Sequence, residues 1–348
     1  MTVPAARVGL SRDFLTTEGE RNFDEAAWQR LAGRTGLDLE FLQGPPASPV
    51  TAGDLERYDA LIIKRNPVAA SIFGPAPPRV RLIARNGVGV DHIDLAACSR
   101  AGVMVATTPD AVARPVASAV MAMILAFSHD VFARDRMARA GRWAERWNRP
   151  GIGLTGRTLG VVGLGNIGLE VLRLASPWGM QHLGATPHPD PARYTDLRVT
   201  TVPLEPLLAR SDFVALCCPL NDATRGMIDA RALASMQPHA YLINTARGEV
   251  VEEAALVEAL RERRIAGAGI DVYEHEPPRN DHPLFALDNV ILGSHNLAYT
   301  DEMNRRSNHG VVDAVSSFLD GNVPVHIVNK AVLASPGWRG SARRTQLR

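Results

Sequence analysis

The chain has 348 residues, more than one hydrophobic core usually holds, so two domains are expected. Hydrophobic residues make up 46% of the chain and charged residues 22%, the balance of an ordinary globular protein. The formal net charge of +1 argues against a nucleic-acid or membrane-surface partner. No apolar run reaches about 18 residues, which argues against a membrane-spanning segment. Three cysteines that cannot all pair and an N-terminus without a secretory pattern favour a cytoplasmic location.

The first hundred residues alternate between expected strands and helices. Short β-branched runs at 7–10, 60–63, 82–84 and 103–106 predict buried strands, and an amphipathic pattern predicts a helix over 23–33. Such alternation is typical of βαβ units around a parallel sheet. The proline-rich segment 74–78 predicts a surface loop.

A long apolar helix is expected over 116–130, and its composition indicates burial on nearly all sides. A second alternating series follows, with strands expected at 158–162, 182–185, 213–216, 240–243, 267–271 and 290–292. Helices are expected at 166–178, 204–209, 231–236 and 252–263, with a final helix at 301–320. This second series has the element count of one complete dinucleotide-binding domain.

Residues 331–348 form a segment that carries positive charge and no acid. Its four arginines predict a solvated basic tail; they are Arg339, Arg343, Arg344 and Arg348.

A glycine motif directly follows the expected strand 158–162, and a helix opens within it. The motif is Gly163, Leu164, Gly165, Asn166, Ile167 and Gly168. Its first glycine permits a tight turn, the second lets the backbone approach a pyrophosphate, and the third allows close packing of helix on strand. Helix N–H groups and the helix dipole would then face the phosphates. The motif therefore predicts a dinucleotide site.

The second part of that fingerprint is missing. An acid at the end of the next strand would bind the ribose 2′-hydroxyl of NAD, but Thr186 stands there. An acid would repel a 2′-phosphate, so its loss permits NADP, and His188 and Arg193 could supply positive charge. The cofactor is expected to be NAD or NADP, with a slight preference for NADP.

Three later segments place chemically useful side chains just beyond expected strands. Arg247 follows 240–243, and its planar guanidinium suits a carboxylate. Glu276 lies shortly after 267–271, and His295 follows 290–292. Hydride transfer to a carbonyl needs a proton donor, a cation for the substrate carboxylate and a group that tunes the donor. A carboxylate beside His295 would keep the imidazole charged and fix its tautomer.

With these segments, the chain resembles the D-isomer-specific 2-hydroxyacid dehydrogenases, the group that contains D-3-phosphoglycerate, glyoxylate/hydroxypyruvate and D-lactate dehydrogenases. The resemblance covers about residues 7–328. The segments that carry it are 86–94, 163–168, 211–213, 218–220, 244–248, 271–273, 276–277 and 294–296. Four positions depart from the common pattern, namely Ser118, Thr186, Cys217 and Asn296.

The resemblance implies interconversion of a 2-keto acid and a D-2-hydroxy acid, with Arg247 binding the substrate, Glu276 pairing with the base and His295 as the acid/base. Asp271 would hold the nicotinamide carboxamide. Further cofactor contacts are expected at strand ends, from Thr186, His188, Cys218, Pro219, Thr245 and Ala246. On the substrate side, the resemblance implies contacts from Lys64, Arg65, Val88 and Gly89.

The implied fold is α/β with two Rossmann-like domains. A discontinuous, flavodoxin-like substrate domain would comprise 1–107 and 303–330, and a doubly wound NAD(P)-binding domain would comprise 108–302. The helix at 116–130 would then contribute to a homodimer interface. No metal-ligand spacing is present in the sequence, so no metal is expected.

One alternative function remains on the same fold. Some relatives act as dinucleotide-sensing corepressors, which bind partner proteins and turn over no metabolite. Turnover of NADPH or NADH with a panel of 2-keto acids distinguishes the two functions.

Overall fold

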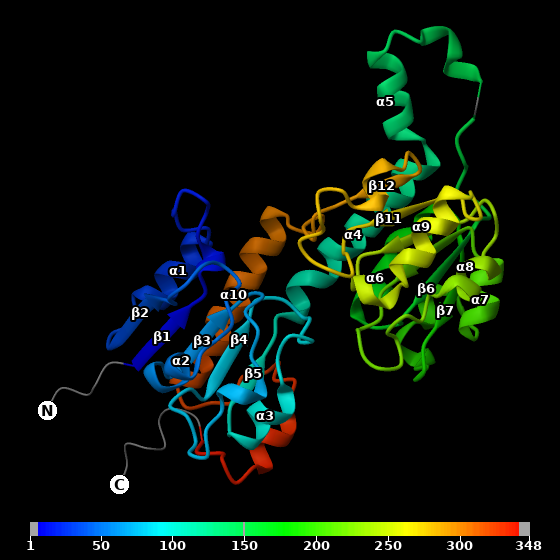
Figure 1. Cartoon of the computed structure of the whole chain (residues 1–348). Coiled ribbons are helices and arrows are strands. Elements are labelled where there is room, and N and C mark those ends of the chain that lie inside the picture. The colour runs from blue at the N-terminus through cyan, green and yellow to red at the C-terminus, as the bar shows by residue number, and fades with distance from the viewer. Residues whose placement is uncertain (1–5, 149, 341–348) are drawn as a thin grey trace, which may run out of the picture. The chain divides into compact units, whose positions relative to one another are not determined.

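The computed structural model describes residues 6–148 and 150–340. The chain forms two compact units (Figure 1). Unit 1 consists of Met1–Val112 together with Thr300–Arg348, and unit 2 consists of Ala113–Tyr299. Each unit is built around its own parallel sheet.

Unit 1 contains a five-stranded parallel sheet in the order β2-β1-β3-β4-β5. Its strands are β1 (Ala6–Leu10), β2 (Leu37–Phe41), β3 (Ala60–Ile63), β4 (Leu82–Arg85) and β5 (Met104–Ala106). Its helices are α1 (Glu25–Ala32), α2 (Ala52–Arg57), α3 (Leu95–Arg100) and α10 (Asp301–Leu319). This strand order is that of flavodoxin-like folds, as expected.

The last helix makes unit 1 discontinuous in sequence. Val311, Val315 and Phe318 of α10 are fully or almost fully buried and pack in the same core as Val8 and Ile62 of the sheet. A helix from near the end of the chain thus completes a core begun by the first strand.

Unit 2 contains a seven-stranded parallel sheet in the order β12-β11-β10-β9-β6-β7-β8. Its strands are β6 (Thr158–Val162), β7 (Gln181–Ala185), β8 (Val199–Thr201), β9 (Phe213–Leu216), β10 (Tyr241–Asn244), β11 (Gly267–Ile270) and β12 (Val290–Leu292). Its helices are α5 (Val131–Arg139), α6 (Asn166–Ala175), α7 (Leu204–Arg210), α8 (Ala230–Ser235) and α9 (Glu253–Arg261). The order reverses between β6 and β9, which is the doubly wound arrangement with its switch point at the glycine motif.

The register of this sheet brings the strand ends together. Val162 of β6 is level with Leu216 of β9 and Ala185 of β7. Asn244 of β10 is level with Leu216 and with Ile270 of β11. All loops that leave the carboxyl ends of these strands therefore start from one edge of the sheet, where open α/β sheets bind ligands.

Helix α4 (Pro109–Ser128) crosses from unit 1 to unit 2 in sequence. By length and composition it could cross a membrane, contrary to the expectation from the sequence, but 56% of its most apolar window is buried inside the protein. Ala117, Val120 and Ile124 lie in the core of unit 2. Its apolar composition is therefore explained by packing within its own chain.

Several elements were not predicted from the sequence. β2 and β8 are edge strands, and α2 and α3 have six residues each, too short for a clear periodic signal. α5 is highly charged, with no buried residue.

The expected solvated tail is wrong for its first part. Residues Lys330–Ala334 form a 3₁₀ helix in which Val332 is buried, and Trp338 packs against the core of unit 1. The last eight residues, 341–348, with Arg343, Arg344 and Arg348, lie outside the described part.

Candidate active site

The glycine motif has the backbone that a dinucleotide site needs. Gly163 has φ +99°, and a Cβ there would lie 2.7 Å from the backbone N of Cys218. A Cβ on Gly168 would lie 2.0 Å from the carbonyl oxygen of Gly163, so this glycine lets α6 pack against the end of β6. A Cβ on Gly165 would meet nothing within 4 Å, so that backbone is open to a close approach. The local geometry at each of the three glycines is thus compatible with the role predicted for it.

The residues around this motif also fit a bound dinucleotide. Gly165 caps the N-terminus of α6, whose first-turn N–H groups have no acceptor within the helix. Burial raises the pKa of the Cys218 thiol to about 11, so no thiolate charge lies beside the motif. The hydroxyl of Thr245 is buried and has no hydrogen-bond partner among the described residues, which leaves it available to a ligand.

The loop after β7 carries the residues that the sequence predicted for the adenosine end of the cofactor. Thr186 is half-buried at the strand end, and His188 is exposed. Arg193 is also exposed, and its Nη2 donates a hydrogen bond of 2.8 Å to Oδ1 of Asn166, the first residue of α6. This contact places a guanidinium at the glycine motif, from a position 27 residues later in the chain.

Arg247 is held by the turn that follows β10. The side chain of Asn244 makes that turn, since Oδ1 accepts the N–H of Ala246 and Nδ2 donates to the carbonyl of Arg247. Nη1 of Arg247 donates to the carbonyl of Ala246 at 2.7 Å. Pro219, after β9, is exposed on the same edge of the sheet.

Gly248 packs the Arg247 turn onto the loop that carries Glu276. A Cβ on Gly248 would lie 2.0 Å from the carbonyl oxygen of Tyr273 and 2.3 Å from the N of Glu274. Only a glycine allows this approach without displacing backbone. The spacing of Arg247 and Glu276 therefore depends on a residue without a side chain.

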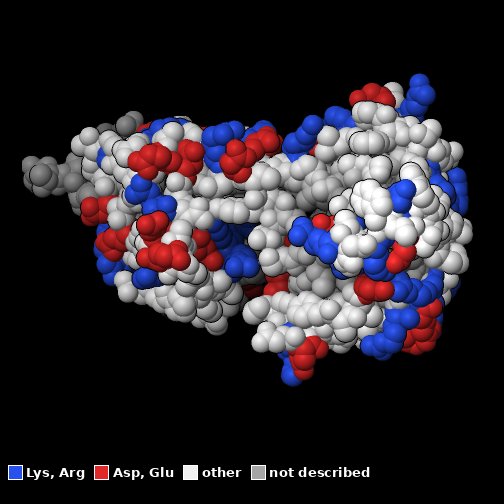
Figure 2. Space-filling model, turned by 90° about the horizontal axis from the view of Figure 1, so that it is seen from above, with Lys and Arg blue, Asp and Glu red and all other residues white. Residues whose placement is uncertain are grey.

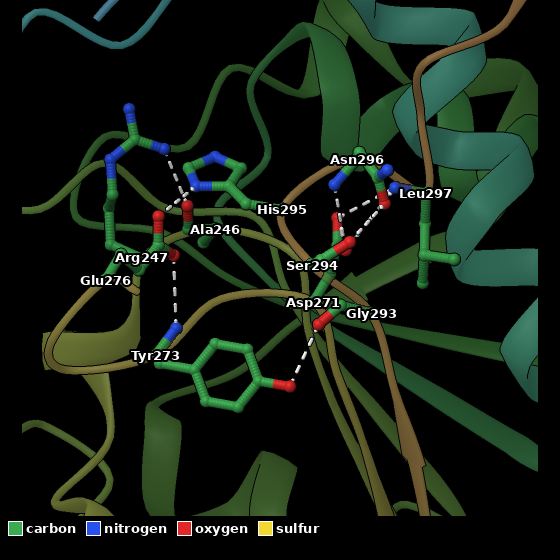
Figure 3. A network of polar contacts seen from close by, with 10 residues as sticks. All are labelled: Ala246, Arg247, Asp271, Tyr273, Glu276, Gly293, Ser294, His295, Asn296 and Leu297. Atoms are coloured by element: carbon green, nitrogen blue, oxygen red, sulfur yellow. Dashed lines mark hydrogen bonds and ion pairs between the residues drawn. The ribbon is translucent and has the colours of Figure 1, made fainter. Parts of the chain in front are cut away.

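Glu276 and His295 form a hydrogen-bonded pair (Figure 3). Nδ1 of His295 lies 2.7 Å from Oε2 of Glu276, while Oε1 of Glu276 accepts the N–H of Tyr273 at 3.2 Å. Their side chains are 33% and 28% exposed, so the pair is accessible from solvent. In Figure 3 the side chains of Arg247 and His295 extend to the same side of this network.

His295 has a backbone conformation that is rare for residues with a side chain. Its φ is +57°, and its N–H donates to the carbonyl of Asp271 at 2.7 Å. Such left-handed residues cluster at functional sites, where the surroundings hold them in place.

Asp271 is the group that holds the His295 loop. Its carboxylate accepts the N–H groups of Asn296 and Leu297 at 3.2 to 3.3 Å. The residue is buried, and desolvation raises its pKa despite these hydrogen bonds. The sequence interpretation assigned Asp271 to the cofactor only, and this anchoring contact could not be read from it.

The expected substrate residues of the first domain lie in unit 1, at the carboxyl ends of β3 and β4. Lys64 donates from Nζ to the carbonyl of Asp13 at 3.1 Å, and burial lowers the pKa of its ammonium. Arg65 is exposed, Val88 is 36% exposed, and Gly89 is intermediate. The preceding Gly87, with φ +127°, provides the turn that opens this segment.

The chain is similar to known proteins over most of its length. Residues 121–296 match the model of the D-isomer specific 2-hydroxyacid dehydrogenase NAD binding domain. A glyoxylate reductase of Korarchaeum cryptofilum is 36% identical over 321 residues, which cover 90% of this chain and 95% of the relative.

Two solved structures share the fold over nearly the whole chain. An NADPH-dependent glyoxylate/hydroxypyruvate reductase from Sinorhizobium meliloti, in complex with NADP and malonate, is 25% identical with a TM-score of 0.78 and covers 97% of this chain and 99% of its own. A D-lactate dehydrogenase from Aquifex aeolicus, in complex with NAD and lactic acid, is 25% identical with a TM-score of 0.79. The match covers 93% of this chain and 99% of the dehydrogenase. The chain is an oxidoreductase that acts on 2-hydroxy acids and uses NAD or NADP. It belongs to the D-isomer-specific 2-hydroxyacid dehydrogenase family.

Proposed function

We propose that the protein reduces a small 2-keto acid to the D-2-hydroxy acid, with His295 as proton donor, Glu276 as its partner and Arg247 as the carboxylate site. The observation that carries this proposal is the 2.7 Å contact between Glu276 and His295. The pair is partly exposed at the strand-end edge of the sheet that also carries the glycine motif. When bound, the dinucleotide supplies the hydride.

The protein's own residues perform the remaining tasks. Glu276 accepts from Nδ1 of His295 and so leaves Nε2 as the ring nitrogen that gives its proton to the developing alkoxide. The Glu276 carboxylate also holds the imidazole ring in one orientation for proton donation. The guanidinium of Arg247 neutralises the substrate carboxylate and polarises the neighbouring carbonyl.

Cofactor choice is part of the proposal, with a preference for NADP. Thr186 adds no negative charge at the end of β7, and Arg193 brings a positive charge to the glycine motif. The 2′-phosphate of NADP would therefore be attracted by Arg193, and residue 186 would not repel it. The Gly163–Gly168 motif would hold the pyrophosphate, and Asp271 and Thr245 the nicotinamide end.

We further propose that unit 1 supplies Lys64, Arg65, Val88 and Gly89 to substrate recognition. Lys64 and Arg65 are cationic and follow β3, and the backbone at Val88 and Gly89 is partly exposed after β4. Together these groups suit an anionic substrate. The names of the relatives make glyoxylate and hydroxypyruvate the first candidates.

A homodimer is also proposed, with its interface extended beyond 116–130. The residues of α4 that face solvent are mostly small or polar, such as Arg114, Ser118 and Ala122. Large apolar side chains are exposed in the segment that follows and projects from the body of unit 2 (Figure 1), namely Val131, Phe132, Trp143 and Trp147. Such a concentration of exposed apolar surface indicates an interface.

The surface charge agrees with a small-molecule substrate and a second copy as the partners. Lysine and arginine are interspersed with aspartate and glutamate over the face in Figure 2. The three cysteines are free thiols, in keeping with a reducing compartment such as the cytoplasm.

The test is turnover of NADPH and NADH with glyoxylate, hydroxypyruvate, phosphohydroxypyruvate, pyruvate and bulkier 2-keto acids, with chiral analysis of the product. We expect reduction of at least one of these acids to the D-isomer. Absence of turnover with all of them, together with tight dinucleotide binding, would support the corepressor-like alternative.

A further inference from the structure

A second histidine–glutamate pair lies beneath the loop that carries Glu276. Glu253 is the first residue of α9, and His282 caps the 3₁₀ helix Pro283–Ala286. Nε2 of His282 lies 2.8 Å from Oε1 of Glu253, and the two side chains are only 11% and 21% exposed. This pair is more buried than Glu276 and His295, whose side chains are 28% and 33% exposed.

The hydrogen bonds around His282 assign its tautomer. The N–H of Leu284 donates to Nδ1 of His282 at 3.3 Å, so Nδ1 acts as an acceptor. The ring proton then lies on Nε2, which donates to Glu253. The imidazole is thus held at both nitrogens, and its orientation is set by two separate elements. Asp281 and Tyr273 are the other titratable groups that face it.

The pair contacts the loop that carries Glu276 at two successive residues, Tyr273 and Glu274. Oε2 of Glu253 accepts the N–H of Glu274 at 3.2 Å. The ring of His282 packs edge-on against Tyr273, with centroids 5.5 Å apart and an interplanar angle of 77°.

Tyr273 in turn forms hydrogen bonds near Glu276 and His295. Its N–H donates to Oε1 of Glu276, whose Oε2 contacts His295, and its hydroxyl donates to the carbonyl of Gly293 at 2.9 Å. Figure 3 shows these contacts on both sides of the Tyr273 ring. Tyr273 therefore links the loop of Glu276 to the strand end that leads to His295.

We propose that Glu253 and His282 are positioning residues that hold Tyr273 and Glu274, and through them hold Glu276 against His295. The inference rests on the proposed roles of Glu276 and His295. A hydrogen bond to a carboxylate is stronger than a neutral one, and removing one partner of a buried pair leaves the other unsatisfied. Small displacements of catalytic groups lower rates steeply.

Two substitutions at His282 separate positioning from mere packing. His282→Asn keeps an amide near the place of Nδ1, where it can accept from Leu284, but it cannot reach Glu253. His282→Gln extends an amide towards the place of Nε2, where it can donate to Glu253, but it gives up the contact with Leu284. Glu258→Gln, on the exposed face of the same helix α9, is the matched control.

For His282→Asn we expect kcat of keto-acid reduction to fall by on the order of 10- to 100-fold, with little change in KM. The rate falls because Glu276 is held less firmly between Tyr273 and His295. His282→Gln should restore most of kcat, and Glu258→Gln should match the wild type.

Equal loss of kcat in the Asn and Gln variants, or a wild-type kcat in the Asn variant, would overturn the proposal. Thermal unfolding checks that each variant folds. If His282→Asn does not fold, Glu253→Gln replaces it, because its amide has only one oxygen for two donors and loses one contact.

A measurement without turnover separates this proposal from the proposed function. In the cofactor-free protein with ¹⁵N-labelled histidine, the hydrogen-bonded Nδ1–H of His295 is identified by its loss in His295→Gln. We expect that signal to disappear in His282→Asn and to remain in His282→Gln. Its persistence in His282→Asn would refute the positioning role even if no substrate were found.

Discussion

Nδ1 of His295 lies 2.7 Å from Oε2 of Glu276, and the other oxygen of that carboxylate accepts the N–H of Tyr273. The carboxylate thus contacts the imidazole on one side and the backbone of its own loop on the other. This contact holds the ring in one orientation through Nδ1. In the proposed mechanism, Nε2 is the nitrogen that gives its proton to the substrate.

The first prediction concerns the proton donor. His295→Ala should lower kcat in both directions by on the order of 10²–10⁴, because no other group replaces the proton donor. Dinucleotide affinity should stay near that of the wild type, since the glycine motif is untouched. Steady-state kinetics and fluorescence titration measure the two quantities, and a wild-type kcat would rule out His295 as the acid/base.

The second prediction concerns Arg247. In Arg247→Lys a point charge replaces a planar fork that already donates one N–H to Ala246. We expect KM for the keto acid to rise by roughly tenfold or more, the loss of about 1.4 kcal/mol of binding. Initial rates over a range of keto-acid concentrations test this. An unchanged KM would show that the carboxylate binds elsewhere.

The third prediction concerns cofactor choice. Arg193→Gln should raise KM for NADPH by roughly tenfold and leave that for NADH nearly unchanged, because only NADPH carries the phosphate. Thr186→Asp should act in the same direction by adding a repulsive charge. Arg231→Gln, an exposed arginine on α8, is the control. Equal effects on both cofactors would exclude Arg193 from 2′-phosphate recognition.

The fourth prediction concerns the pH dependence of stability at Asp212. Burial raises the pKa of this carboxyl, but hydrogen bonds from the N–H of Thr158, from Arg157 and from His239 outweigh it and place the pKa below its usual range. A carboxyl whose pKa is lowered by folding stabilises the folded protein above about pH 4, its usual pKa. This stabilisation is lost as the pH falls from there through the lower pKa of the folded protein.

Asp212→Asn should therefore lower the free energy of unfolding by about 1–3 kcal/mol at pH 7. The difference from the wild type should shrink as the pH falls below about 4. Urea unfolding at a series of pH values measures it. A difference that does not change with pH would contradict the assigned ionisation.

The fifth prediction concerns oligomeric state. Trp147, 81% exposed, and Phe132, 51% exposed, are two of the large apolar side chains that the projecting segment exposes. The double substitution Phe132→Ser with Trp147→Ser should convert a dimer to a monomer in light scattering. Trp178→Ser, at an exposed tryptophan elsewhere in unit 2, should leave the dimer intact. A double variant that stays dimeric would place the interface elsewhere.

Much of the fold and of the candidate site could be predicted from the sequence, because these features depend on local sequence patterns. The spacing of Gly163, Gly165 and Gly168 after a strand predicted the turn, the open backbone and the close packing that the structure has. The strand-end positions of Arg247 and His295 followed from counting strands in a parallel sheet. Both inferences depend on residues close together in sequence.

What the sequence could not reveal depends on contacts between distant segments. Gly248 has no local signature, and its role follows only from its approach to Tyr273. His282 belongs to no local motif, and nothing near it in sequence points to Glu253, 29 residues earlier. The apolar helix α4 was assigned partly to a dimer interface, because burial against its own sheet cannot be told from burial against a second copy.

The division of the chain has a consequence for how the protein can change. Unit 2 is the continuous stretch Ala113–Tyr299, and the chain passes between the two units once at each end of it. This stretch contains the glycine motif and Arg247, Asp271, Glu276 and His295. Exchange of this stretch between relatives, with one crossover at each end, would transfer the residues of the proposed proton chemistry and the glycine motif together. Lys64 and Arg65 would remain with the recipient. The residues proposed for the chemistry and those proposed for substrate recognition therefore lie in separate segments of the sequence.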